Sequence, residues 1–478
     1  MTHTKYNKTK IIATLGPATS DIPMLTKIFK AGVDVCRINF SHGSWEVHKE
    51  VIENVREVNR QMGTSVAILG DLQGPKLRIG EVENNSMLLE EGATMTLTTQ
   101  ATISSGSVIY VKYSTLARDV KVGERVLLDD GKLELEFTKR VDEHTVEAKV
   151  INGGILSSNK GFNLPSSDMS VASLTPKDRK DLEFIMENDF DWVALSFVRA
   201  AKDIIELREI LKANNCTAKI VAKVEKPQAV DNIDEIIAAT DAIMVARGDL
   251  GVEMPMEQVP MIQKRIVTKC LEASKPVIIA TQMMESMITS PTPTRAEAND
   301  IANAVMDGAD AVMLSAETSV GDYPLKAVQA VEKILGSTEL GWDIYNKIKK
   351  PDPSSPSFVS DRICYATVSM SDGISAKAII SMTQTGYTAF KIASGRPNCD
   401  VFIFTANKKL ISQLSLLWNV RAFYYDKKTN TDETIADVIA ELKEKQFLKD
   451  GDVVINTAAM PVIENRKTNT MKISTVGE

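Results

Sequence analysis

Several features that define common protein classes are scarce or missing in this sequence. Its 478 residues contain only five cysteines, which are odd in number and widely spaced, so they form neither a disulfide framework nor a zinc motif. Aromatic residues make up 5% of the chain, and no basic arm is interleaved with them. No apolar run approaches the roughly 18 residues that span a bilayer, and the N-terminus is polar. These absences predict a protein of the reducing cytoplasm without a nucleic-acid or membrane partner.

The two common glycine-rich phosphate loops are also missing. Neither GxxxxGK[ST] nor GxGxxG occurs, so any nucleotide is bound without such a loop. The hydrophobic share of 44% and the charged share of 25% are ordinary for a globular protein. The net charge is -7, which still allows a local cationic pocket for an anionic substrate.

Eight short apolar segments rich in β-branched residues recur along the chain, with helical stretches between them. Such strands indicate a parallel sheet covered on both faces, and eight of these units close a (β/α)8 TIM barrel. The segments are residues 10–16, 33–40, 65–72, 192–198, 218–225, 242–249, 276–282 and 311–317.

The long gap between the third and fourth segments and the chain after the eighth predict two further domains. Short alternating runs inside the gap indicate a small β barrel inserted at the mouth of the TIM barrel. Beyond a proline-rich linker at residues 351–358, four or five more strand-like segments indicate an α/β domain with an open sheet. The predicted units are a catalytic barrel (1–72 and 170–340), an inserted β lid domain (73–169) and a C-terminal regulatory domain (341–478).

Polar residues occur at the carboxyl end of every predicted barrel strand, where enzymes of this fold carry their sites. A single polar residue at a strand end is more often solvated or part of a structural ion pair. Here all eight predicted strands end in polar residues, which indicates an active site. They are Thr14, Arg37, Asn39, Ser41, His42, Asp71, Ser196, Lys223, Glu225, Arg247, Gly248, Asp249, Thr281, Gln282, Ser315 and Glu317.

Three of these residues predict magnesium-dependent phosphoryl transfer. Glu225 and Asp249 end adjacent strands, where two carboxylates fit Mg2+ and leave positions for substrate oxygens and water. Lys223 lies two residues before Glu225, so both side chains project from the same face of the strand. An ammonium beside the metal suits a transferring phosphoryl group, and a plain Lys–Glu ion pair is the alternative. The stretch ARGD at 246–249 opens a helix whose free N–H groups favour an anion such as a carboxylate.

With these residues in place, the sequence resembles the pyruvate kinase family over essentially its whole length. The motifs are long and occur in the family's order: TKIIATLGPAT, GVDVCRINFSHG, GDLQGPKLRIG, DDGKLEL, KGFNLP, MVARGDLG, ATQMMESM and GADAVMLSAETSVGDYP. The resemblance implies the glycolytic transfer of a phosphoryl group from phosphoenolpyruvate to ADP, giving pyruvate and ATP. It also implies a cytoplasmic homotetramer.

The resemblance implies roles for the matching residues. Glu225 and Asp249 would hold Mg2+, with Mn2+ as an alternative metal, and Lys223 and Arg37 would bind the phosphoryl group. The N–H groups of Gly248 and Asp249 would bind the substrate carboxylate. Thr281 would protonate the enolate or orient the water that does. The implied nucleotide-binding residues are Asn39, His42, Arg78 and Lys160. The predicted catalytic set is Lys223, Arg37, Thr281, Arg78 and Lys76. The three other histidines, His3, which lies outside the residues that the structure describes, His48 and His144, are expected at the surface.

Lys76 departs from the pattern of many family members. Those members carry a glutamate there and bind K+ through the residues matching Asn39, Ser41, Asp71 and the carbonyl of Leu72. This chain resembles the subgroup in which a lysine takes the place of the cation, so K+ is not expected to be required. An exposed loop lysine without a role in turnover is the alternative.

The stretch TQTGYT at 383–388 follows a predicted strand and opens a helix. In the family this loop receives a phosphorylated effector, which would contact Thr383, Thr385, Gly386 and Thr388. Helix capping by Thr385 or Thr388 is the alternative.

Two functions from other classes stay open at this point. A Mg2+-dependent carbon–carbon lyase acting on a 2-keto acid would leave Lys223, Arg37 and the inserted domain unused. A non-catalytic sugar-phosphate sensor would use only the 383–388 loop, and it predicts decay of the barrel site.

Overall fold

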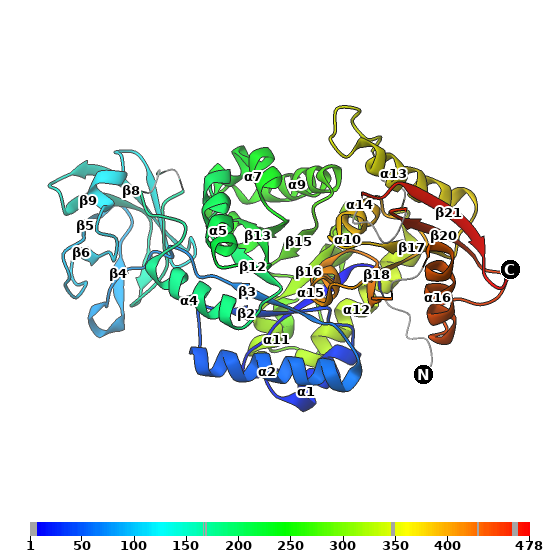
Figure 1. Cartoon of the computed structure of the whole chain (residues 1–478). Helices are drawn as coiled ribbons and strands as arrows, with labels where there is room; N and C mark the ends of the chain where they lie inside the picture. Colours follow the sequence, from blue (N-terminus) through cyan, green and yellow to red (C-terminus); the bar gives the residue numbers. More distant parts are fainter. Residues whose placement is uncertain (1–6, 166, 168–169, 346–348, 428–429, 461–466) are drawn as a thin grey trace.

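The chain folds into three parts that lie in a row (Figure 1): the inserted β domain at the left, a closed barrel in the middle and the C-terminal α/β domain at the right. The structure, a computed structural model, describes residues 7–165, 167, 170–345, 349–427, 430–460 and 467–478. None of the helices in these ranges is long and apolar enough to cross a membrane.

The eight predicted segments form a closed parallel barrel, arranged around the ring in chain order. Parallel pairing of the first strand with the last closes the ring. The strands are β1 (Lys10–Thr14), β2 (Val35–Asn39), β3 (Ala67–Asp71), β12 (Trp192–Leu195), β13 (Lys219–Val224), β14 (Ala242–Ala246), β15 (Val277–Ala280) and β16 (Ala311–Leu314). The helices of this part are α1 (Ile22–Lys30), α2 (Trp45–Met62), α4 (Pro176–Glu187), α5 (Ala201–Ala213), α6 (Pro227–Asp231), α7 (Ile233–Ala239), α8 (Arg247–Glu253), α9 (Val259–Ala273), α10 (Arg295–Asp307), α11 (Ala316–Ser319) and α12 (Pro324–Gly341), with short 3-10 turns η2 (Met256–Gln258) and η3 (Glu285–Ile288).

Both faces of each barrel strand are buried, which explains why the strands are apolar at nearly every position. Side chains change sides at each residue of a strand. Leu69 and Trp192 therefore point into the barrel, whereas Ile68 and Val193 pack outward in the cluster that the strands share with the helices.

Helix boundaries follow capping signals in the sequence. α4 begins after Thr175, whose hydroxyl accepts the N–H of Asp178 while the Asp178 carboxylate accepts the N–H of Thr175. Thr294 and Glu297 form the same reciprocal cap at the start of α10. α10 ends at Gly308 with φ of 103°, a conformation that glycine adopts without strain.

The inserted domain, between β3 and α4, consists of two sheets. The larger has the order β11-β7-β8-β9-β5-β6 and the smaller pairs β10 with β4. The elements are η1 (Glu83–Asn85), β4 (Met87–Leu89), β5 (Thr94–Thr98), β6 (Val108–Tyr110), α3 (Leu116–Asp119), β7 (Arg125–Leu128), β8 (Leu133–Arg140), β9 (Thr145–Asn152), β10 (Gly154–Leu156) and β11 (Phe162–Asn163). Among the described strands, β6 and β11 at the edges of the larger sheet do not pair with each other, so the β barrel predicted here is incomplete.

The described part of the C-terminal domain has five strands in one sheet, in the order β19-β18-β17-β20-β21, with the last strand antiparallel. The elements are α13 (Phe358–Gly373), β17 (Ala378–Met382), α14 (Tyr387–Ser394), β18 (Asp400–Thr405), α15 (Lys408–Gln413), η4 (Leu414–Leu416), β19 (Val420–Tyr424), α16 (Thr431–Glu444), β20 (Val453–Ala458) and β21 (Thr470–Thr475). Apolar residues of α13 and α14 pack on one face of the sheet and those of α16 on the other, as in an open α/β sheet.

Candidate active site

The polar residues at the barrel mouth continue the rows of side chains that point into the barrel. Arg37, Asp71 and Lys223 each lie two residues after an apolar residue of the interior cluster. They are buried, with exposed fractions of 8%, 1% and 9%. The alternation that fills the barrel with apolar side chains therefore also brings these three charges together at its carboxyl end.

Asp71 lies between two cations. Its Oδ2 accepts hydrogen bonds from Nε of Arg37 at 2.7 Å and pairs with a terminal nitrogen of the same guanidinium at 2.7 Å. Its Oδ1 lies 3.3 Å from Nζ of Lys223. Arg37 also donates to the hydroxyl of Thr14 at 2.9 Å. A single carboxylate thus holds a guanidinium from β2 and an ammonium from β13 at the same pocket.

Lys223 has two further partners. Its ammonium lies 2.8 Å from Oε1 of Glu225 and donates to the hydroxyl of Ser196 at 2.7 Å. The Ser196 hydroxyl in turn donates to the carbonyl of Leu72 at 2.7 Å. The other oxygen of Glu225 accepts the N–H of Phe197 at 2.8 Å. The predicted same-face placement of Lys223 and Glu225 is present in the structure.

Burial and neighbouring charges set the protonation of this cluster. Burial opposes the charge of Lys223, but Asp71 and Glu225 outweigh it and raise the pKa of this ammonium above its ordinary value. Burial likewise opposes the charge of Asp71, and Lys223 and Arg37 overcome it, so the pKa of Asp71 is lowered. The pKa of Glu225 is raised, chiefly by burial and then by the nearby charge of Asp249, although Lys223 acts against both.

Gly248 and Thr281 are in direct contact at the ends of β14 and β15. The N–H of Gly248, in the first turn of α8, donates to Oγ1 of Thr281 at 2.7 Å. The Thr281 hydroxyl donates to the carbonyl of Ala280 at 2.6 Å. Thr281 has φ of 68°, which is strained for a β-branched residue. Arg247 stabilises this conformation, because it donates to the Thr281 carbonyl at 2.9 Å and is itself paired with Asp300 at 2.7 Å.

The donor set at the predicted metal site fits a hard divalent cation. The charge of Asp249 contributes to the raised pKa of Glu225, so the two carboxylates lie near each other after adjacent strands. In the described ranges no group of three or more histidine, cysteine or carboxylate side chains is placed to hold a metal ion. Two carboxylates supply part of a coordination shell of oxygens, and substrate and water would have to complete it.

The loop after β2 carries the other residues predicted from this strand. Asn39 and Ser41 are partly buried, and the Asn39 side chain accepts the N–H of Ser41 at 3.1 Å. His42 is exposed. The expectation that His48 lies at the surface is wrong: its ring packs edge-on against Phe40 at 5.0 Å between centroids, and burial lowers its pKa.

Arg78 and Lys160 lie on adjoining segments of the inserted domain. Arg78 pairs with Gly161 in an isolated β-bridge and donates to the carbonyl of Asn159 at 2.9 Å. Lys160 pairs with Asp129 at 2.8 Å. The structure therefore places these two predicted nucleotide residues next to each other.

Lys76 lines a small cavity of about 20 Å³ between the inserted domain and the barrel, together with Asp249 and Lys226. In the described part of the chain, no hydrogen bond or ion pair of the Lys76 side chain joins it to the predicted monovalent-cation residues. The two domains touch beside this cavity, where Asn163 donates to Glu253 at 2.7 Å and Lys226 pairs with the same carboxylate oxygen at 2.6 Å.

Comparison with known proteins identifies the family. The family model described as pyruvate kinase, barrel domain, matches residues 6–328, and the model described as pyruvate kinase, alpha/beta domain, matches residues 361–474. The chain belongs to the pyruvate kinase family.

Individual relatives agree with this assignment. A pyruvate kinase of Sporosarcina psychrophila is 40% identical over 473 residues, covering 98% of this chain and 81% of the relative. A pyruvate kinase of Mycobacterium tuberculosis is 40% identical over 469 residues, covering 98% of both chains. The crystal structure of a pyruvate kinase from Cryptosporidium parvum superimposes with a TM-score of 0.92 at 34% identity, covering 98% of this chain and 96% of that one.

The loop predicted to bind an effector, residues 383–388, has its hydroxyls engaged within the chain. The Thr383 hydroxyl accepts the N–H of Gly386 at 3.0 Å, and that of Thr385 accepts the N–H of Tyr387 at 3.4 Å. Thr388 is buried, and its hydroxyl is 2.7 Å from that of Thr468. Residues 461–466, in the neighbouring segment, lie outside the described residues. The N-cap residue of α14 is Gly386 and no side chain caps this helix, so the alternative of a cap by Thr385 or Thr388 is wrong. The effector site stays a prediction.

Sequence reasoning missed the roles of two residues in this pyruvate kinase site. Asp71 was assigned only to the monovalent-cation pocket, but its carboxylate also holds Arg37 and Lys223. Ser196 was recognised as a polar strand end without a partner, and it joins Lys223 to Leu72. The alternation along each strand indicates that both side chains point to the barrel interior near its mouth, but it does not show which residues they contact.

Proposed function

We propose that this chain transfers the phosphoryl group of phosphoenolpyruvate to ADP, giving pyruvate and ATP, with a divalent cation held by Glu225 and Asp249. The observation that carries the proposal is the convergence of two buried cations, Arg37 and Lys223, on Asp71 beside those carboxylates. Preorganised positive charge in a site shielded from water suits a transferring phosphoryl group, whose negative charge is spread over three oxygens.

Lys223 acts in this proposal as a positive charge and not as a base. Its raised pKa keeps the ammonium protonated at neutral pH. Arg37 reaches the same place from β2, so the two cations contact the phosphoryl group from different sides. Because Asp71 holds both before substrate arrives, little reorganisation is needed during transfer.

The metal would add positive charge at the phosphoryl oxygens. The protein would contribute two carboxylate ligands, those of Glu225 and Asp249. The main-chain N–H of Phe197 orients the Glu225 carboxylate. We propose Mg2+, with Mn2+ as an alternative, because both prefer carboxylate and water oxygens.

Substrate binding would change the partners of Gly248 and Thr281. A substrate carboxylate that accepts the N–H groups of Gly248 and Asp249 replaces the bond that Gly248 now makes to the Thr281 hydroxyl. The Thr281 hydroxyl must also turn from the carbonyl of Ala280 to face the enolate carbon, which gains a proton to become the methyl group of pyruvate. Either this hydroxyl or a water that it orients donates the proton.

ADP is proposed to lie between the barrel and the inserted domain. Closure of the inserted domain would bring Arg78 and Lys160 to the nucleotide, opposite Asn39 and His42, and would exclude water from the transfer. We accordingly propose a lid (73–169), a catalytic barrel (1–72 and 170–340) and a regulatory domain (341–478).

We also infer that turnover does not require K+. Asp71 is already paired with two cations, and the Leu72 carbonyl accepts the hydroxyl of Ser196, so two groups of the monovalent-cation pocket are engaged. Lys76 is exposed, but it lines a cavity together with Asp249, which supports a tethered ammonium acting near the proposed metal and substrate positions. A charge there, at about 5 Å and an effective dielectric near 20, is worth about 3 kcal/mol.

One coupled assay with phosphoenolpyruvate, ADP and Mg2+ tests the reaction. The proposal predicts ATP formation that depends on all three. A carbon–carbon lyase would instead cleave a 2-keto acid without making ATP, and a sugar-phosphate sensor would bind ligand without turnover. The cytoplasmic location and the homotetramer stay predictions, and light scattering on the purified protein tests the tetramer.

A further inference from the structure

The floor of the barrel, at the amino ends of its strands, is closed by a segment of the C-terminal domain. This segment, which we call the plug, is Lys408–Leu416 and consists of α15 and η4. Leu416 is 1% exposed and belongs to the interior cluster, whose other members come from the eight barrel strands. The carbonyl of Gln413 accepts the indole N–H of Trp192, at the start of β12, at 3.2 Å. The plug is therefore part of the barrel core.

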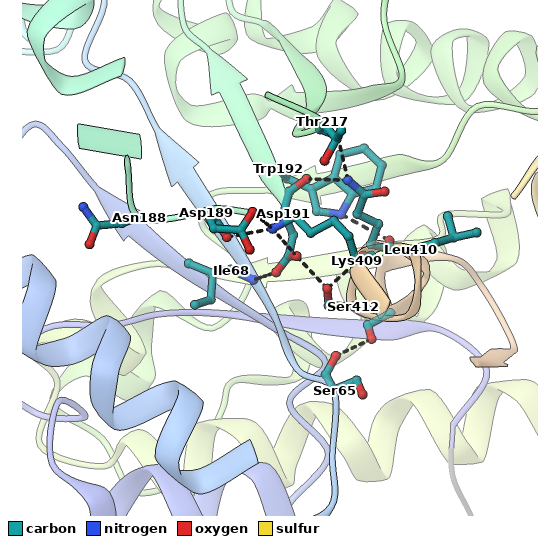
Figure 2. A network of polar contacts seen from close by, with 12 residues as sticks. Ser65, Ile68, Asn188, Asp189, Asp191, Trp192, Thr217, Lys409, Leu410 and Ser412 are labelled. Carbon is teal, nitrogen blue, oxygen red and sulfur yellow. Dashed lines mark hydrogen bonds and ion pairs between the residues drawn. The ribbon is translucent and has the colours of Figure 1, made fainter. Parts of the chain in front are cut away.

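Figure 2 shows the polar contacts between the plug and the barrel around Asp191. Asp191 directly precedes β12 and is 5% exposed. Its Oδ2 accepts the main-chain N–H of Ile68, in β3, at 2.7 Å. Its Oδ1 accepts the Ser412 hydroxyl at 2.6 Å and pairs with the Lys409 ammonium at 3.0 Å. One buried carboxylate thus joins two barrel strands to the C-terminal domain.

Three other aspartates clamp neighbouring strands in the same way. Asp34, Asp241 and Asp310 each directly precede a barrel strand and accept a main-chain N–H from the strand before it, at 2.9–3.0 Å. Asp34 and Asp241 pair with cations of the barrel itself. Asp310 pairs with Arg396 of the C-terminal domain at 3.0 Å. At Asp34 and Asp241 an aspartate therefore joins two neighbouring strands without any cation from the C-terminal domain. At Asp191 the plug adds contacts from that domain to the same kind of strand-joining aspartate.

The two strands joined by Asp191 lead directly to the active site. β3 ends at Asp71, roughly 10 Å from the N–H that Asp191 binds. The interior row that begins with Trp192 at the floor reaches Ser196 at the mouth. A tilt of either strand would move a hydrogen-bond partner of Lys223.

We propose that Asp191 is a positioning residue through which the plug sets the placement of Asp71 and Ser196. The inference rests on the proposed function, because Asp71 and Ser196 influence the transfer only by holding Arg37 and Lys223. It makes the docked C-terminal domain a structural part of the catalytic machinery, whether or not an effector binds there. By linkage, substrate binding at the mouth also strengthens the contacts at the floor.

The test removes the side-chain contacts of the plug with Asp191, and with them the Lys409 contacts to Asp189, and leaves Asp191 and the other plug contacts in place. In the double variant Ser412→Ala/Lys409→Met, Asp191 keeps its bond to β3 but loses both of these partners in the C-terminal domain. The matched control is Ser394→Ala. It removes another hydroxyl contact between the C-terminal domain and the barrel, the 3.0 Å bond to Ser274 at the end of α9, which is not on a barrel strand.

We expect kcat for phosphoryl transfer to fall by about 5- to 20-fold in the double variant, with KM for ADP within about twofold of the parent, since misplaced cations act mainly in the transition state. The control should keep the parental kcat. Ser412→Thr/Lys409→Arg should restore most of it. Combined with Ser196→Ala, the double variant should lose less than the product of the separate effects, because both act on Lys223.

Hydrogen exchange supplies a readout that does not depend on turnover. Amides of residues 67–71 and 192–195 should exchange faster in the double variant than in Ser394→Ala. Unchanged exchange in both strands, or a kcat equal to that of the control, overturns the inference. A parent protein that makes no ATP would contradict the proposed function instead, and the exchange comparison would still decide the coupling. If the double variant does not fold, the kcat and hydrogen exchange of the single variant Ser412→Ala are compared with those of Ser394→Ala instead.

Discussion

Replacing Asp71 by asparagine removes one negative charge from between Arg37 and Lys223 without changing the size of the side chain. Asp71 lies 2.7 Å from the guanidinium and 3.3 Å from the ammonium. The asparagine oxygen can still accept one hydrogen bond, but it cannot offset two buried positive charges. We expect both cations to move apart and to lose the geometry that fits the phosphoryl group.

The size of the effect follows from the distances. At 3.3 Å and an effective dielectric near 20, attraction between Asp71 and Lys223 is about 5 kcal/mol. Lys223 keeps Glu225 at 2.8 Å, so we assign roughly half of this, about 2–3 kcal/mol, to loss of transition-state stabilisation. The corresponding decrease in kcat is about 30- to 150-fold.

The assay is steady-state kinetics at saturating phosphoenolpyruvate and ADP. KM for phosphoenolpyruvate should not rise, because the unpaired cations stay available to the anionic substrate. The control is Asp307→Asn on α10, which removes an ion pair to Lys264 of α9 and touches no barrel strand. A folded Asp71→Asn protein with kcat within threefold of the parent would refute the reasoning.

Three other predictions concern single residues. Lys223→Ala should abolish phosphoryl transfer in a folded protein, and a variant that keeps more than a tenth of parental turnover would assign this lysine another role. Wild-type turnover should change little when K+ replaces a large organic cation at equal ionic strength. The Lys76→Glu variant should have a kcat about 10- to 1000-fold lower than the parent, and added K+ should restore part of the lost activity. Because the pKa of Glu225 is raised, a proton competes with the metal for this carboxylate at pH values above the ordinary pKa of glutamate. Mg2+ affinity measured by calorimetry should therefore fall as the pH decreases toward and through the raised pKa. Glu225→Gln should weaken binding and flatten this dependence, and an unchanged pH profile would contradict the assignment.

The barrel was predictable because its strands are buried on both faces and its polar residues fall at the strand ends. Both signals are local in sequence: apolar runs of fixed length and alternation with a period of two. The same alternation placed Lys223 and Glu225 on one face, which their 2.8 Å contact confirms.

The contacts that depend on segments far apart in sequence were not predictable in this way. Asp71 and Lys223 are separated by the whole inserted domain, so no spacing rule pairs them. Leu416 looks like any apolar residue of the C-terminal domain, but it packs in the barrel because the plug docks there. His48, in contrast, lies on the same face of α2 as Val51 and Ile52, so its helical spacing did indicate burial, and the ring of Phe40 packs against it.

The most direct test of the account follows phosphorus by 31P NMR in a mixture of phosphoenolpyruvate, ADP, Mg2+ and the protein without added K+. The account predicts that the phosphoenolpyruvate signal is replaced by that of the γ-phosphate of ATP, and that the Lys223→Ala protein leaves it unchanged. Release of inorganic phosphate in place of ATP, or equal transfer by the parent and by Lys223→Ala, would contradict the central claim that buried cations on Asp71 direct the phosphoryl group to ADP.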